Sequence, residues 1–213
     1  MPPLVVAAKA IPNSLKAEQL HDYSVNIIKG LVGRKIKVVS YSCDGTETER
    51  AVQRLLKERA THRIQYKIKH PVPGLPDLVI IIAVIDGQVV VMIQDSKHAL
   101  KTSRNNLFTG AKLLTLANHV AMYAYARDLA FGTDSPLYHH DVEKTDRQDD
   151  NAATRITSSG AVVYIAKYHP DRLGFIIYLF IFGELVDAYQ NRKISHLERI
   201  KMVLRARFFC KMW

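Results

Sequence analysis

The hydrophobic pattern of the first hundred residues alternates between extended and helical segments. A β-branched run at 4–8 predicts a strand, and apolar residues at near-helical spacing predict a helix over 14–33. The run 35–42 predicts a buried strand. Thr46 and Glu49 have the Thr-x-x-Glu spacing of a capping box, so a second helix is expected to begin directly after that strand.

Three more extended segments follow. Residues 64–68 alternate, and the β-rich runs 78–85 and 88–94 are separated by Asp86-Gly87. This dipeptide favours a two-residue turn because both of its positions tolerate positive φ. The pattern therefore predicts an antiparallel hairpin.

The pattern becomes mainly helical beyond about residue 100. It predicts helices at 99–108, 111–131, 173–189 and 196–209. A single strand is expected at 161–165, and the polar segment 132–160 is expected to form loops. The chain therefore divides into an α/β part and a mainly helical part.

Composition and charge narrow the functional classes. Of the 213 residues, 48% are hydrophobic and 23% are charged, which is typical of a globular protein and excludes a disordered or low-complexity chain. The formal net charge of +10 favours affinity for polyanions such as DNA.

Several features favour an intracellular protein that has no membrane partner. Cys43 and Cys210 are far apart and lack metal-ligand spacing, so we expect free thiols in a reducing compartment, nuclear or cytoplasmic. The N-terminus lacks the pattern of a secretory signal. The most apolar run, 175–182, is far shorter than the ~20 residues of a membrane helix.

Two carboxylates are candidates for metal chemistry. Asp44 and Asp95 each lie where a predicted strand gives way to a predicted helix. Side chains at strand ends converge on ligands in α/β sheets, and Mg²⁺ or Mn²⁺ prefers oxygen ligands of this kind. The alternative is structural, because Asp-Gly is a common turn and Asp-Ser is an ordinary start of a helix.

Three further residues share one face of the helix that follows Asp95. His98 is in position to support Asp95 or donate to a phosphate, while Lys101 and Arg104 continue the face at three-residue steps and are candidates for contacts with a DNA backbone. The alternative is an ordinary solvated helix face.

Other basic and polar clusters carry weaker signals. The basic C-terminal end and the segment from Tyr138 to Asp141 suggest nucleic-acid binding and metal binding respectively, but a solvated face explains the first equally well and the second lacks a matched set of ligands. The chain contains no phosphate-binding GxxxxGK[ST] loop, GxSxG elbow or HExxH motif.

Two segments carry a family resemblance. The string VVSYSCDGT at 38–46, followed by QDSKHALK at 94–101 and by Arg104, Asn105 and Asn106, resembles P-element and THAP-type DNA transposases. This resemblance implies an α/β fold with a partial RNase H-like mixed sheet and flanking helices over 1–108. It also implies a mainly helical, insertion-like region over 109–213, which in some members is associated with a nucleotide.

The resemblance also implies roles for individual residues. Asp44 would be the second of three catalytic acids and a metal ligand, with Asp95 as a further ligand, His98 in support, and Lys101, Arg104 and Asn105 in the DNA-binding motif. No residue here matches the first or third catalytic acid. We therefore expect an internal piece of a longer transposase that is inactive in DNA strand cleavage and transfer by itself.

The alternative function is a non-catalytic module that binds nucleic acid or protein. The expected cofactor is Mg²⁺ or Mn²⁺, and the expected partners are DNA and a nucleotide in the helical region, with homo-oligomers left open.

Overall fold

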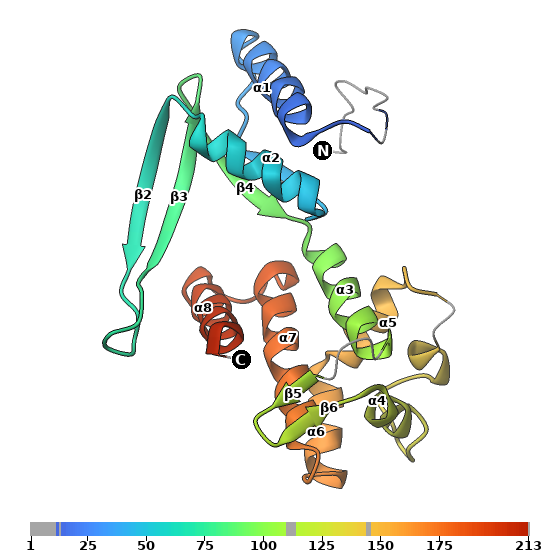
Figure 1. Ribbon diagram of the computed structural model, residues 1–213. Helices are drawn as coiled ribbons and strands as arrows, with labels where there is room; N and C mark the ends of the chain where they lie inside the picture. Colours follow the sequence, from blue (N-terminus) through green and yellow to red (C-terminus); the bar gives the residue numbers. More distant parts are fainter. Residues whose placement is uncertain (1–11, 13, 110–113, 144–145, 213) are drawn as a thin grey trace. The chain divides into compact units, whose positions relative to one another are not determined.

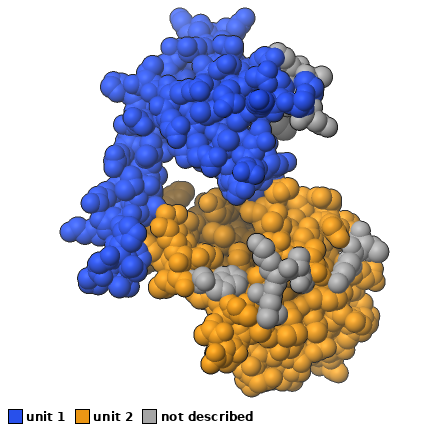
Figure 2. Space-filling view, viewed as in Figure 1, with its two compact units in different colours: residues 1–95 blue, residues 96–213 orange. Residues whose placement is uncertain are grey.

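The computed structural model describes residues 12, 14–109, 114–143 and 146–212 (Figure 1). The strand expected at 4–8 lies outside these residues. The chain forms two compact units, 1–95 and 96–213, which Figure 2 shows in two colours. Each unit has its own buried core.

Unit 1 is built on a mixed four-stranded sheet with the strand order β1-β4-β3-β2. The strands are β1 (Ser40–Cys43), β2 (His62–Ile68), β3 (Leu78–Ile85) and β4 (Gln88–Gln94). β1 and β4 are parallel, whereas β2, β3 and β4 form an antiparallel meander. The hairpin between β3 and β4 turns at Asp86 (φ 50°) and Gly87 (φ 77°), as the sequence predicts.

Two helices pack against this sheet (Figure 1). They are α1 (Ala17–Gly33) and α2 (Glu47–Glu58). The capping box expected at Thr46 is present, with the amide of Glu49 donating to the Thr46 hydroxyl. The core of unit 1 is formed by six buried apolar residues: Ile28, Val52, Leu56, Ala83, Ile85 and Val90.

Unit 2 is mainly helical and also contains a short hairpin. Its elements are α3 (Ser96–Thr109), β5 (Leu114–Leu116), β6 (His119–Ala121), α4 (Tyr123–Ala130), the 3-10 helix η1 (His139–Val142), α5 (Asp150–Ile156), α6 (Ser159–Tyr168), α7 (Leu173–Gln190) and α8 (His196–Met212). α3 packs against α5 and α7, so it belongs to this unit, although the family resemblance implies a boundary after residue 108.

The central helix of unit 2 is α7. Phe175 and Leu179 on this helix have no exposed surface. With a mean hydropathy of 1.4, α7 is also long and apolar enough to cross a membrane by length and composition, and a third of its residues are buried within the chain. Its partners include α3, α6, α8 and β6.

Two sequence predictions in the second half of the chain are wrong. In place of a helix over 111–131, the described residues form the β5–β6 hairpin followed by α4, and the chain reverses at Ala117, which has a left-handed conformation (φ 50°). In place of a strand at 161–165, the chain is helical. Ala161 and Ile165 lie one turn apart and are fully buried, so tertiary packing outweighs the β-branched composition.

The segment 132–160, expected to be loops, contains η1 and α5. The sequence does predict the last two helices, which the structure places at α7 and α8. Both cysteines are free, as their spacing predicts.

Candidate functional site

Asp44 and Asp95 leave the same end of two neighbouring parallel strands. In the register of β1 and β4, Cys43 lies opposite Gln94, and each aspartate follows directly on one of these paired residues. The ladder continues one step further, because the Asp95 amide donates to the carbonyl of Cys43 over 2.8 Å. Neighbouring strands lie ~4.8 Å apart, so the backbone segments that follow β1 and β4 leave the sheet side by side.

The chemistry of these two side chains suits a hard divalent cation. The Asp44 side chain is exposed and that of Asp95 is half-buried. Mg²⁺ is commonly held by one or two carboxylates while water and substrate phosphates fill its remaining positions. Asp44 and Asp95 lie at one end of the sheet, and their role as ligands of Mg²⁺ or Mn²⁺ stays a prediction.

The backbone after Asp44 is fixed by a tight turn into α2. Gly45 has a φ of +85°, and a Cβ there would lie 3.4 Å from the side chain of Gln94. One residue later, the Thr46 amide donates to the Glu49 carboxylate over 3.1 Å. The position of Asp44 is therefore set by a paired strand before it and a capped helix after it.

A buried side-chain amide connects α2 to β4, the strand that precedes Asp95. Gln53 is 7% exposed, and its Nε2 donates to the carbonyl of Ile93 over 2.9 Å. Beside it, burial raises the pKa of the Cys43 thiol. This contact of Gln53 could not be predicted, because a glutamine next to the apolar positions of a helix gives no local signal of its partner.

Arg104, predicted to contact DNA, is buried in unit 2 at 2% exposure. Its guanidinium donates to the carbonyl of Asp141 (2.9 Å), to that of Asp146 (2.8 Å) and to that of Glu143 (3.2 Å). Burial lowers its pKa, against the opposing effect of Asp149 and Asp141, but an arginine stays protonated in proteins. The cation therefore joins the backbone at Asp141, Glu143 and Asp146 to α3 and is not presented to a polyanion.

Other residues of the α3 motif contact the same downstream region. Lys101 pairs with Asp150 at 3.3 Å, and the Asn105 amide donates to the carbonyl of Arg147 over 3.3 Å. His98 is half-buried at the start of α3. Because Asp95 belongs to unit 1 and His98 to unit 2, support of Asp95 by His98 stays a prediction.

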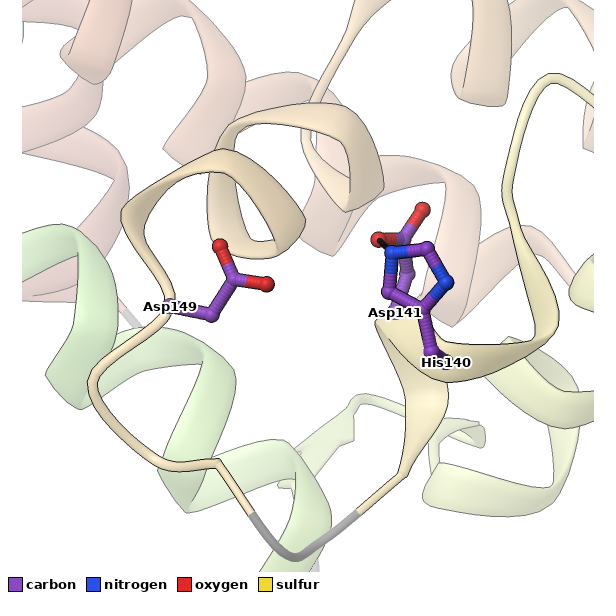
Figure 3. A group of neighbouring side chains, drawn as sticks. All are labelled: His140, Asp141 and Asp149. Carbon is purple, nitrogen blue, oxygen red and sulfur yellow. Dashed lines mark ion pairs between the residues drawn. The ribbon is translucent and has the colours of Figure 1, made fainter.

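One His/Asp cluster in unit 2 has ligand atoms close enough for a metal ion. The ligand atoms of His140, Asp141 and Asp149 lie within 4.8 Å of one another (Figure 3). Asp141 is fully buried, however, and accepts from Nε of Arg155 (2.8 Å) and from the amide of Tyr138 (2.9 Å). The guanidinium supplies the positive charge that an ion would bring, so this cluster does not fit a metal site.

A small cavity lies beside the α3 motif. It has a volume of about 200 Å³ and is lined by Arg104, Asn105, Phe108, Thr109 and Arg147. The guanidinium of Arg104 already donates to three carbonyls, so Arg147, beside the ring of Phe108, is the basic residue of this lining that is suited to an anion with a planar group.

Comparison of the chain with family models, with curated proteins and with solved structures finds no match. Fold and site therefore define a class only: a mixed α/β unit with carboxylates at the end of a parallel strand pair, joined to a helical unit.

Proposed function

We propose that the chain is a transposase-derived protein whose unit 1 is part of an RNase H-like domain, and whose ancestral reaction is metal-dependent DNA strand cleavage and transfer. Asp44 and Asp95 would hold Mg²⁺ or Mn²⁺. Such ions activate the attacking oxygen and stabilise the leaving oxygen of a phosphodiester.

One observation carries this proposal. The two aspartates of the transposase-like motifs, about fifty residues apart in sequence, follow adjacent positions of two parallel strands. This placement brings both aspartates to the carboxyl end of a parallel strand pair, which is where α/β sheets bind ligands. The net charge of +10 adds support, since it favours a polyanionic substrate.

Titration calorimetry with Mn²⁺ tests the metal site. We expect one class of binding site, lost in both Asp44→Asn and Asp95→Asn because each substitution removes an anionic ligand. Asp86→Asn is the matched control. Asp86 lies in the turn before β4, at the opposite end of that strand from Asp95, so this substitution should leave Mn²⁺ binding unchanged. Equal Mn²⁺ binding by all four proteins would contradict the proposal.

A strand-cleavage assay on gels tests the activity. Because residues matching the first and third catalytic acids are not found, we expect little or no Mg²⁺- or Mn²⁺-dependent cutting by the chain alone. Robust cutting that Asp44→Ala abolishes would show that these ligands suffice and would overturn the expectation of inactivity.

The second candidate function is a non-catalytic module that binds nucleic acid. The observation that favours it is the basic character of α8, whose five basic residues are Arg199, Lys201, Arg205, Arg207 and Lys211. Salt-sensitive DNA binding that is indifferent to Asp44→Ala would support this alternative.

A nucleotide in unit 2 belongs to the proposal as well. The cavity lined by Arg147 and Phe108 supports it. Binding of a fluorescent guanine or adenine nucleotide tests this, and we expect Arg147→Ala to weaken it. The location that we propose for the protein, nuclear or cytoplasmic, gives it access to nucleotides and DNA.

A further inference from the structure

The strands β2 and β3 extend beyond the rest of the sheet as a two-stranded arm. β2 pairs with β3 over its whole length, from His62 opposite Val84 to Ile68 opposite Leu78. β4 pairs only with the end of β3, at 83–85. We call residues 64–68 and 78–82, which pair with each other alone among the described residues, the β arm, and Figure 1 shows β2 and β3 as a long ribbon.

The β arm exposes apolar side chains on both faces. Its exposed large apolar residues are Ile64, Tyr66, Val79, Ile80 and Ile81, from 37% to 56% exposed. A ribbon of two strands is only marginally stable in water, and clustered exposed apolar residues mark interaction surfaces. These exposed apolar residues therefore mark the arm as an interaction surface for another segment.

The outer side of the arm is an open strand edge. β2 is the last strand in the order β1-β4-β3-β2, and among the described residues it pairs with β3 alone. Its backbone can receive a further strand through main-chain hydrogen bonds, a common mode of peptide recognition.

Charge on β2 disfavours a second copy of the chain as that strand. Arg63 and Lys67 lie on the same face of β2 and are exposed. When two copies of β2 pair antiparallel in the register that joins all seven residues, Arg63 of each lies opposite Lys67 of the other. Like charges in directly opposite positions are destabilising, so this pairing of two copies is energetically unfavourable.

The same charges favour an acidic strand. On β2 the basic face carries Arg63 and Lys67, and the other face carries Ile64, Tyr66 and Ile68. Lys67 remains 65% exposed although it pairs with Asp77 at 3.1 Å. A segment that alternates acidic and apolar residues complements both faces at once.

We propose that the free edge of β2 binds an extended segment of a partner protein in which acidic and apolar residues alternate, added as a fifth strand of the sheet. This surface is separate from the aspartates at the end of β1 and β4, and the inference does not depend on the proposed function.

Fluorescence anisotropy with the full chain tests the proposal. The probe is a fluorescein-labelled nine-residue peptide of alternating valine and glutamate, and the comparison peptide alternates valine and lysine. We expect the glutamate peptide to bind about tenfold more tightly, since two cross-strand charge pairs change from repulsive to attractive. Arg63→Glu/Lys67→Glu should reverse this preference.

Two further variants complete the test. Arg50→Glu/Arg54→Glu places the same charge change on the exposed face of α2 and should keep the wild-type preference. Arg63→Gln/Lys67→Gln, a milder change, should bind both peptides equally. Circular dichroism checks that each variant is folded.

Three results would overturn the proposal. The first is no binding of either peptide, and the second is binding that the Arg63/Lys67 variants leave unchanged. The third is displacement of the glutamate peptide by a DNA duplex whose binding also requires Arg63 and Lys67, because the arm would then bind nucleic acid.

Discussion

At the scale of single residues, Arg104 shows that the partner of a side chain decides its role more than its type does. Local spacing places Arg104 on a basic helix face with Lys101, a pattern typical of polyanion contact. Its partners in the structure are carbonyl groups 37 to 42 residues further along the chain. No local pattern reveals a partner at that distance, so the buried role could not be predicted.

Removing the Arg104 guanidinium should destabilise unit 2. In Arg104→Ala, the carbonyls of Asp141, Glu143 and Asp146 lose their donor, which we expect to cost about 2–4 kcal/mol of unfolding free energy. Arg104→Lys should recover only part, since one ammonium cannot reach all three carbonyls. Urea unfolding followed by circular dichroism measures both.

Asn106→Ala on the exposed side of α3 is the control and should change stability by less than about 0.5 kcal/mol. If Arg104→Ala unfolds like the wild type but binds DNA more weakly, the guanidinium serves the polyanion and not the fold.

Asp149 should stabilise α5 in a pH-dependent way. Its carboxylate accepts from the amides of Asn151 (2.8 Å) and Ala152 (2.9 Å), and these backbone hydrogen bonds hold its pKa below the ordinary value. We expect Asp149→Ala to cost about 1 kcal/mol at pH 7. Asp149→Asn keeps a capping oxygen and should cost much less.

The sign of the pH effect follows from the lowered pKa. The ionised cap contributes its full stability above the unfolded pKa of about 3.9, and this contribution is lost as the pH falls through the folded pKa. The difference between wild type and Asp149→Asn should therefore shrink below about pH 4. A difference that grows with acid would contradict this account.

At the scale of elements, the sequence predicts structure best where the cause is local. The Asp86-Gly87 turn and the Thr46–Glu49 capping box are short-range devices, and both are present. The helix at 161–165 depends on burial against distant residues, so its β-branched composition is misleading. For the same reason, the strand ends at Asp44 and Asp95 were predictable, but the parallel pairing of their strands was not.

The hairpin between β3 and β4 should depend on Gly87. A side chain at φ 77° is strained, so we expect Gly87→Ala to cost about 1 kcal/mol. Asp86→Asn should be nearly neutral, because asparagine tolerates the left-handed region at φ 50°. Hydrogen exchange of the β3 and β4 amides, with urea unfolding, measures both, and the reverse order of effects would refute the turn assignment.

At the scale of the whole molecule, the two units have separate cores. One core contains Leu56 with residues from α1, α2, β3 and β4 only. The other contains Leu179 with residues from 107 to 179 only. No residue belongs to both of these clusters, so each unit has its own source of hydrophobic stabilisation.

Matched substitutions in the two cores should therefore act on different unfolding transitions. Leu56→Ala and Leu179→Ala remove the same atoms from sites that are 1% and 0% exposed, and each should cost about 2–5 kcal/mol. Scanning calorimetry should show two transitions, one lowered by each variant by roughly 10 °C, and Leu197→Ala on the exposed side of α8 should lower neither. Because the two core clusters share no residue, the double variant should show both shifts, each on its own transition. A single transition that both substitutions move equally would mean that the units unfold as one cooperative body.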